Sequence, residues 1–188
     1  MTTIPAIKEL QPHIVAIATG TDDMLVRQLI EKSKQPNILK YTPNDAGKRF
    51  KDAESFKTWQ TGGREIHWLL GPDNDLAGIL WYGKKLFPLA DIRLNELPEE
   101  TLAIRLYDGY TGHGLARPAM QQSLALHVQT KQQNNEPVIG LWLQTDCGNA
   151  AAIATYTKFG YKEVARDGKR VTMILSADEV KRKGGDAL

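Results

Sequence analysis

The chain has 188 residues, of which 41% are hydrophobic and 24% charged, and its formal net charge is +2. A chain of this length and composition can bury a hydrophobic core, which excludes a disordered chain, a collagen-like repeat and a small disulfide-stapled scaffold. Cys147 is the single cysteine, so no intrachain disulfide or cysteine-rich metal cage can form, as is usual in a reducing compartment.

Charge and hydropathy also bear on partners and location. No stretch approaches the roughly 20 apolar residues of a membrane span, and the first residues lack the basic and then apolar regions of a signal peptide. The 24 basic and 22 acidic residues nearly balance, and no basic run exceeds Lys181-Arg182-Lys183. We therefore expect a cytoplasmic protein with no metal site and no membrane or nucleic-acid partner.

In the first half of the chain, the pattern predicts a strand over 13–18 and then a helix with N-cap candidates at 21–23. The helix carries its apolar residues at helical spacing: Leu25, Val26, Leu29 and Ile30. A second helix is expected over 52–60. Two apolar runs, 64–70 and 76–82, predict strands joined by a turn at 71–75. The stretch 83–99 has no clear period and predicts a long loop.

The second half predicts a strand over 101–107, a glycine-rich loop and a helix with apolar residues at i, i+4 spacing. A strand over 138–145 follows, and Asn149 can cap a helix that ends at Gly160. Strands over 161–165 and 170–175 flank Asp167-Gly168, a two-residue hairpin signal. The polar residues from Ser176 onward predict one capped turn and then disorder. This order predicts an α+β fold with a mixed sheet and helices on its faces.

The glycine-rich loop reads Thr111-Gly-His-Gly-Leu-Ala116 and joins a strand to a helix. Its glycines let the backbone approach an anion, and its N–H groups and the helix N-terminus point towards such a ligand. The loop is neither a Walker A motif nor the dinucleotide fingerprint of a parallel βαβ unit. It predicts a phosphate cradle, with a plain strand-to-helix turn as the alternative. Arg117 opposes the helix dipole unless an anion binds there; the alternative is a solvated side chain.

These residues resemble the Gcn5-related N-acetyltransferase (GNAT) superfamily, whose Gln/Arg-x-x-Gly-x-Gly/Ala loop binds the pyrophosphate of acetyl-coenzyme A. Gly114 and Ala116 match that motif, and Thr111 stands where it has Gln or Arg. Downstream, Asn149 to Tyr161 matches every position of the family's Asn-x-x-Ala-x-x-x-Tyr-x-x-x-Gly-Phe/Tyr pattern. The resemblance covers 101–175 closely and the earlier residues by element order only.

The resemblance implies a single GNAT-like domain over 1–176, an α/β/α sandwich, followed by a polar tail over 177–188. Its sheet would be mixed and mostly antiparallel, with about seven strands and about four helices. It further implies an N-acetyltransferase that moves an acetyl group from acetyl-coenzyme A directly to a primary amine. The residues that it places at the coenzyme are Ile104, Arg105, Leu106, Thr111, Gly112, His113, Gly114, Leu115, Ala116, Arg117, Asn149 and Tyr156.

Two catalytic roles follow from the resemblance. Tyr156 matches the tyrosine that protonates the coenzyme A sulfur, and the alternative is a packing residue. A lysine-like amine must also lose a proton, which costs roughly 4–5 kcal/mol at pH 7. The base position of ribosomal-protein-type members holds Gln144, whereas that of histone-type members holds Glu100, for which we expect a raised pKa at the mouth of a cleft. Asp108 and a water held by Gln144 are the alternatives, besides a solvated Glu100.

Other readings stay open at this stage. A non-catalytic relative that senses an acyl-coenzyme A is the main rival, and a protein-interaction domain with a vestigial cradle is the third. His67 is expected to be a packed residue and Cys147 a structural thiol. The acceptor amine is not identified by the sequence, and the protein is expected to be a monomer or a homodimer.

Overall fold

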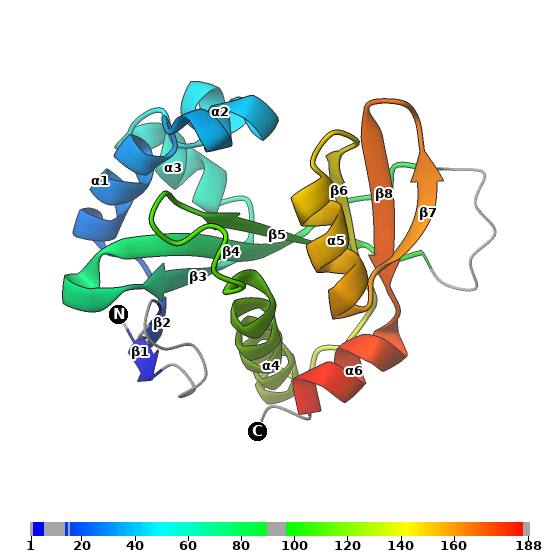
Figure 1. Ribbon diagram of the computed structural model, residues 1–188. Helices are drawn as coiled ribbons and strands as arrows, with labels where there is room; N and C mark the ends of the chain where they lie inside the picture. The colour runs from blue at the N-terminus through cyan, green and yellow to red at the C-terminus, as the bar shows by residue number, and fades with distance from the viewer. Residues whose placement is uncertain (1, 6–13, 15, 90–96, 186–188) are drawn as a thin grey trace. The chain divides into compact units, whose positions relative to one another are not determined.

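One mixed sheet of eight strands runs through the structure in the order β1-β2-β3-β4-β5-β6-β8-β7 (Figure 1). The structure is a computed structural model that describes residues 2–5, 14, 16–89 and 97–185. The chain divides into two compact units, Met1–Trp81 with Ile104–Met120, and Tyr82–Ala103 with Gln121–Leu188. The division falls within β4 (Leu76–Lys84), β5 (Glu100–Leu106) and α4 (Ala116–Gln133).

The first unit begins with antiparallel strands. β1 (Thr2–Pro5) pairs with β2 (Ala16–Thr19), and β2 pairs with β3 (Arg64–Leu70). A 3₁₀ turn at Pro72–Asn74 then leads into β4. β3 occupies exactly the predicted range, and β4 extends two residues beyond it. The strand expected over 13–18 forms over Ala16–Thr19; residues 13 and 15 lie outside the described residues.

Helices α1 (Asp23–Lys32), α2 (Pro36–Tyr41) and α3 (Ala53–Gln60) gather beside β3 and β4 (Figure 1). Asp22 caps α1 through a side-chain oxygen, as the sequence predicts. Asp52, expected as the first residue of the second helix, instead precedes α3 and caps it through its side chain. Between α2 and α3 the chain forms a π-helix, Asp45–Arg49. Neither α2 nor the π-helix is predicted by the sequence pattern, because neither has a long apolar stripe.

Aromatic side chains fill the core of the first unit. Phe50 meets the Trp59 ring edge to face at a centroid distance of 4.9 Å, and Trp59 meets Trp81 at 5.3 Å. Phe56 bridges Trp59 and Trp68, with both centroid distances 5.8 Å. Rings packed in this way contribute both buried apolar area and favourable ring-edge electrostatics. This cluster holds α3 and the π-helix against β3 and β4.

The second unit contains β6 (Leu141–Asp146), α5 (Ala150–Phe159), β7 (Lys162–Arg166) and β8 (Arg170–Leu175). β6 runs parallel to β5 and antiparallel to β8, and β7 closes the edge as the antiparallel partner of β8. The β7–β8 connection consists of residues 167–169, three residues in place of the two-residue turn that Asp167-Gly168 indicated. Its Gly168 has a φ of +86°, and Asp167 Oδ1 accepts hydrogen bonds from the Lys169 and Arg170 amides.

The α+β fold class is thus confirmed, with eight strands and six α-helices in the described residues against the expected seven and four. The expected disorder after Ser176 is wrong, because Ala177–Gly185 forms helix α6. Val180 and Gly184 of this helix are buried. The segment 177–185 has few apolar residues, so its sequence gives only a weak signal for a packed helix. A small residue such as Gly184 nevertheless lets the helix pack closely.

Gly184 allows that close approach, and its replacement tests α6. A Cβ at Gly184 would lie 2.5 Å from the Val128 Cγ2 on α4, whereas a Cβ at Gly185 would meet nothing within 4 Å. We expect Gly184→Ala to lower the free energy of unfolding by about 1–3 kcal/mol through overpacking. The matched variant Gly185→Ala should leave it unchanged or slightly raised. Equal unfolding curves for the two variants in urea would show that α6 does not pack in this way.

Candidate acetyl-transfer site

The glycine-rich loop between β5 and α4 has the backbone of an anion cradle. Gly112 and Gly114 have φ values of +82° and +74°, a conformation that favours glycine. Residues 111–114 are exposed, and a Cβ at either glycine would project into open space. Alternating left-handed and right-handed residues turn successive N–H groups towards one side, the arrangement of an anion-binding nest.

The amides of this loop are available to a ligand. Five backbone N–H groups of the loop and the start of α4 donate to no acceptor within the described part of the chain. They belong to Gly112, Gly114, Leu115, Ala116 and Arg117. Leu115 anchors the loop, since its side chain is buried and its carbonyl accepts a hydrogen bond from the Ala119 amide at 3.1 Å. The loop therefore offers donors at the positive end of a helix of 18 residues.

Side chains around the cradle are exposed. Thr111 and His113 lie on the loop surface, and Arg117 is exposed in the first turn of α4. Arg117 makes no ion pair within the described residues. A cation in the first helical turn is unfavourable by itself, and a bound anion would relieve that repulsion.

The strand before the cradle contains a buried ion pair that the sequence analysis missed. The Arg105 Nε lies 2.6 Å from Asp45 Oδ2, and the Arg49 Nη1 lies 2.7 Å from Asp45 Oδ1. The Arg105 guanidinium also lies over the Trp81 ring and donates to the Ile104 carbonyl. The Arg105 side chain is thus already engaged, and the side chains of Ile104 and Leu106 are aliphatic. Any contact of these three residues with a thioester carbonyl would therefore come from their backbone N–H groups.

Tyr107 is the buried neighbour of this pair. Its ring is fully buried, and its hydroxyl has no hydrogen-bond partner among the described residues. Burial and the nearby Asp45 carboxylate raise the pKa of Tyr107 far above its usual value. The hydroxyl therefore stays protonated at every physiological pH. No sequence pattern identifies Asp45 or Tyr107 as partners, since 60 residues separate Asp45 from Arg105.

In the second unit, α5 presents the other motif as predicted. Asn149 caps α5 through Oδ1, which accepts a hydrogen bond from the Ala152 amide at 3.1 Å, and Gly160 ends the helix with a φ of +114°. Tyr156 is 7% exposed, and its ring meets Tyr161 at a centroid distance of 5.9 Å. Tyr161 is fully buried, which raises its pKa, and its hydroxyl has no partner in the described structure.

Glu100 lies in a buried charged network. Its side chain is 7% exposed, with Oε2 3.3 Å from His127 Nε2 and Oε1 3.2 Å from Lys131 Nζ. The His127 ring stacks on Tyr82 at 3.9 Å, and Lys131 also contacts Glu136. Burial opposes ionisation of Glu100, but His127 and Lys131 outweigh it and lower the pKa of the carboxyl. The expected raised pKa is therefore wrong, because the contacts of Glu100 with His127 and Lys131 of α4 were not foreseen.

The pH dependence of stability tests this network. Folding lowers the pKa of Glu100, so the ionised carboxylate stabilises the fold at every pH above its unfolded-state pKa near 4.5. This stabilisation is lost as the pH falls through the folded-state pKa. We expect Glu100→Gln to destabilise the fold by about 1–3 kcal/mol at pH 7, with the deficit shrinking on acidification. Urea titrations across pH measure it. Glu99→Gln, at an exposed neighbour, is the control, and an equal deficit for both would contradict the network.

The remaining candidates occupy varied surroundings. His67 is buried and its Nε2 lies 2.9 Å from Glu65, which agrees with a packed residue. Gln144 is exposed and its Nε2 donates to Thr172 Oγ1 at 3.0 Å. Asp108 is exposed just after β5.

Among the described residues, no group of three or more His, Cys, Asp or Glu side chains could hold a metal ion, and no helix is long and apolar enough to cross a membrane.

No protein-family model matches the chain, and no curated protein matches its sequence. Solved structures do match. A spermidine N-acetyltransferase from Vibrio cholerae, in complex with coenzyme A and spermine, aligns with a TM-score of 0.64 at 14% identity over 88% of this chain and 98% of its own. An aminoglycoside acetyltransferase in complex with coenzyme A and kanamycin aligns with a TM-score of 0.62 at 15% identity over 88% of this chain and 96% of its own.

A third match has no assigned function. An uncharacterized protein from Bacillus halodurans aligns with a TM-score of 0.63 at 15% identity, over 99% of this chain and 95% of its own. At such identities the alignments establish the architecture and leave the chemistry to the residues themselves. The chain therefore has the fold of these acetyltransferases, as its two motifs predicted.

Proposed function

We propose that this protein is a GNAT-superfamily enzyme that transfers an acetyl group from acetyl-coenzyme A to a primary amine. The observation that carries the proposal is the positive φ of Gly112 and Gly114 in the exposed loop before α4. The amides of Gly112, Gly114, Leu115, Ala116 and Arg117 donate to no acceptor within the described residues. The fold shared with acetyltransferases and the complete match from Asn149 to Tyr161 support it.

The cradle would bind the cosubstrate through its pyrophosphate. Gly112 and Gly114 let two negatively charged phosphates approach the backbone, and the start of α4 adds its dipole. Arg117 supplies the nearby cation. Because backbone amides make most of these contacts, Thr111 in place of Gln or Arg removes one side-chain contact and keeps the main donors.

The transfer would proceed by direct attack of the amine on the thioester carbonyl. The amine nitrogen forms a bond to the acetyl carbon, and the carbon–sulfur bond then breaks. A backbone N–H at 104–106 is proposed to stabilise the negative charge on the carbonyl oxygen. Tyr156 is proposed to give its phenolic proton to the leaving thiolate and to recover one from the solvent.

The ammonium form of the acceptor must lose a proton before the amine can attack, and this proton needs another acceptor, since His127 and Lys131 already engage Glu100. Asp108 lies in the same unit as the cradle and has an exposed carboxylate. Gln144 donates through Nε2 to Thr172, which leaves its Oε1 able to hold a water. We propose that one of these two routes removes the proton, and that Glu100 serves to hold β5 and α4 together.

An acyl-coenzyme A sensor is the second candidate function. Two residues favour it. Thr111 stands where the GNAT pyrophosphate motif has Gln or Arg, and Gln144 stands where ribosomal-protein-type members of the superfamily have a carboxylate base. A sensor would bind the coenzyme with the same cradle and would release no free thiol.

A thiol-release assay with acetyl-coenzyme A and a panel of amines tests the proposal. The panel would contain a polyamine, an aminoglycoside, a lysine-containing peptide and free amino acids, with mass spectrometry of the products. We expect amine-dependent release of thiol and a product heavier by one acetyl group. Coenzyme A binding without any release would instead support the sensor, and the absence of binding would refute both.

A further inference from the structure

Tyr110 directly precedes the glycine-rich loop and connects it to a neighbouring hairpin. Its hydroxyl donates a hydrogen bond to Asp75 Oδ2 at 2.9 Å, and Asp75 ends the turn that joins β3 to β4. The side chain is almost buried. Burial and the Asp75 carboxylate raise the pKa of Tyr110 to about 12. The hydroxyl therefore stays protonated and donates to Asp75 throughout the physiological pH range.

Lys32, the last residue of α1, binds the same carboxylate. Its Nζ lies 2.8 Å from Asp75 Oδ1, 3.0 Å from Oδ2 and 5.8 Å from the centroid of the Tyr110 ring. Burial opposes the ionisation of Asp75, but the hydrogen bonds from Lys32 and Tyr110 outweigh it and lower the pKa of the carboxyl. Asp75 is therefore ionised at neutral pH. Lys32, Asp75 and Tyr110 together form what we call the anchor cluster.

Gln28 holds the hairpin turn against α1. It lies four residues before Lys32, so both side chains project from the same face of the helix. Gln28 Nε2 donates to the Asn74 carbonyl at 3.1 Å, and Gln28 Oε1 accepts a hydrogen bond from the Leu76 amide at 2.7 Å. These two bonds flank Asp75 in the sequence. The acceptor of the Tyr110 hydroxyl is thus fixed on both sides by α1.

The glycine at position 71 makes room for Tyr110. A Cβ there would lie 2.7 Å from Cζ of the Tyr110 ring and would also clash with its hydroxyl oxygen. Gly71 has a φ of −85°, which any residue adopts. Space and not backbone conformation therefore requires glycine at this position, and an added methyl group would push the tyrosine away from Asp75.

We propose that Tyr110 is a positioning residue whose hydrogen bond to Asp75, supported by Lys32, holds the cradle in the conformation that binds the coenzyme. This role rests on the proposed function. Residues 111–114 are exposed, whereas the buried Leu115 fixes the end of the loop next to α4. Tyr110 fixes the other end, one residue before the first cradle amide at Gly112. A loop held at both ends loses less entropy when it binds a ligand.

Tyr110→Phe and Tyr107→Phe form a matched pair. Each removes one hydroxyl from a buried tyrosine close to the loop, but the Tyr107 hydroxyl has no hydrogen-bond partner among the described residues. We expect Tyr110→Phe to weaken coenzyme A binding about fivefold in calorimetry, as loss of one hydrogen bond implies. In thiol release it should raise KM for acetyl-coenzyme A and leave kcat nearly unchanged. Tyr107→Phe should bind coenzyme A like the wild type, and equal affinities of the two variants would overturn the proposal.

¹⁵N relaxation of the ligand-free protein tests the positioning without any coenzyme. In Tyr110→Phe, the order parameters of the Gly112 and Gly114 amides should fall from about 0.85, typical of rigid backbone, towards the flexible range below about 0.6. Tyr107→Phe should keep the wild-type values. Unchanged order parameters in Tyr110→Phe would show that the hydroxyl does not fix the loop. A wild type that binds no coenzyme A would refute the proposed function, and the order parameters would still decide whether Tyr110 fixes the loop.

Variants of the facing turn separate the hydrogen bond from the tyrosine ring. Asp75→Asn keeps an acceptor for the Tyr110 hydroxyl, whereas Asp75→Ala removes it. Only the alanine variant should weaken coenzyme A binding as much as Tyr110→Phe does. Gly71→Ala should weaken binding to a similar extent, because it displaces a tyrosine that is itself unchanged. Wild-type affinity in both Asp75→Ala and Gly71→Ala would contradict the anchor cluster.

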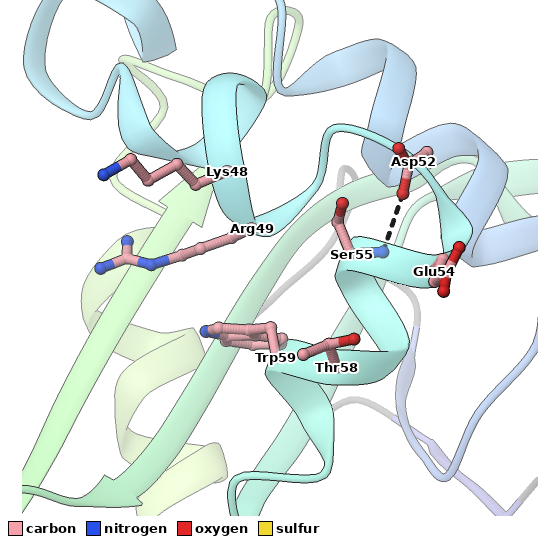
Figure 2. A pocket seen from close by; sticks show the side chains of 7 residues that line it. All are labelled: Lys48, Arg49, Asp52, Glu54, Ser55, Thr58 and Trp59. Atoms are coloured by element: carbon pink, nitrogen blue, oxygen red, sulfur yellow. Dashed lines mark hydrogen bonds between the residues drawn. The ribbon is translucent and has the colours of Figure 1, made fainter.

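A matched pair of lysines tests the part played by Lys32. Loss of any positive charge can weaken the attraction for an anionic ligand, so Lys48→Gln is the control for Lys32→Gln. Lys48 belongs to the same unit and is exposed, and Figure 2 shows its side chain extending away from α3. We expect Lys32→Gln to bind coenzyme A at least about twofold more weakly than Lys48→Gln, since a partly exposed ion pair contributes little free energy. Equal affinities would exclude Lys32 from the anchor cluster.

Discussion

A Gly114→Val variant should bind coenzyme A about tenfold or more weakly than the wild type while it stays folded. At a φ of +74°, valine is strained, and relaxation of the loop would turn its amides away from the ligand. A tenfold loss corresponds to about 1.4 kcal/mol, the order of one good hydrogen bond to a charged group. Calorimetric titration with coenzyme A measures it.

The control for this variant is Gly168→Val in the β7–β8 connection. Gly168 has a φ of +86°, and its Cβ would also meet nothing within 4 Å, so the two substitutions carry a similar backbone cost. Gly168→Val should keep the wild-type affinity for coenzyme A. An unchanged affinity for coenzyme A in a folded Gly114→Val variant would contradict the proposal that the loop amides bind the coenzyme.

Replacement of Tyr156 by phenylalanine should lower turnover by about 10²-fold or more and leave coenzyme A affinity within a factor of about two. The ring packing against Tyr161 is kept, so the melting temperature should change little. Steady-state thiol release, combined with calorimetry, separates the two effects. If the protein is a sensor, the wild type will already show no thiol release. If the wild type is active and Tyr156→Phe keeps full activity, Tyr156 is a packing residue and not the proton donor.

Tyr161→Phe is the matched control, since it removes a hydroxyl from the adjacent ring. That hydroxyl is buried and has no partner in the described structure, so its loss should cost no hydrogen bond and should leave the fold as stable or more stable. Turnover should stay near the wild-type value. A fall equal to that of Tyr156→Phe would show that the effect belongs to the ring cluster and not to one proton donor.

Local sequence signals predicted the elements with clear boundaries. Asp22 and Asn149 each cap the helix that the sequence placed after them, and β3 and β8 occupy the ranges that their apolar runs predicted. Such features depend on residues a few positions apart. The conformations of Gly112 and Gly114 were likewise foreseeable, because few other residues adopt a positive φ.

Features that depend on distant residues escaped prediction. Glu100 was expected at the mouth of a cleft, yet His127 and Lys131 reach it from α4, 27 and 31 positions later in the chain. Asp45 is a buried partner of Arg105 only because tertiary folding brings the π-helix to β5. Helix α6 was missed since its docking depends on the space left by Gly184 beside Val128.

Amide NMR of the loop tests the central claim most directly. On titration with coenzyme A, the ¹H–¹⁵N resonances of Gly112, Gly114, Leu115 and Ala116 should shift, because these N–H groups would gain charged acceptors. Inorganic pyrophosphate should shift the same signals in the same direction at higher concentration, and Gly168 should stay in place. Saturating coenzyme A that leaves the four loop resonances unmoved would contradict the cradle and, with it, the proposed acetyl transfer.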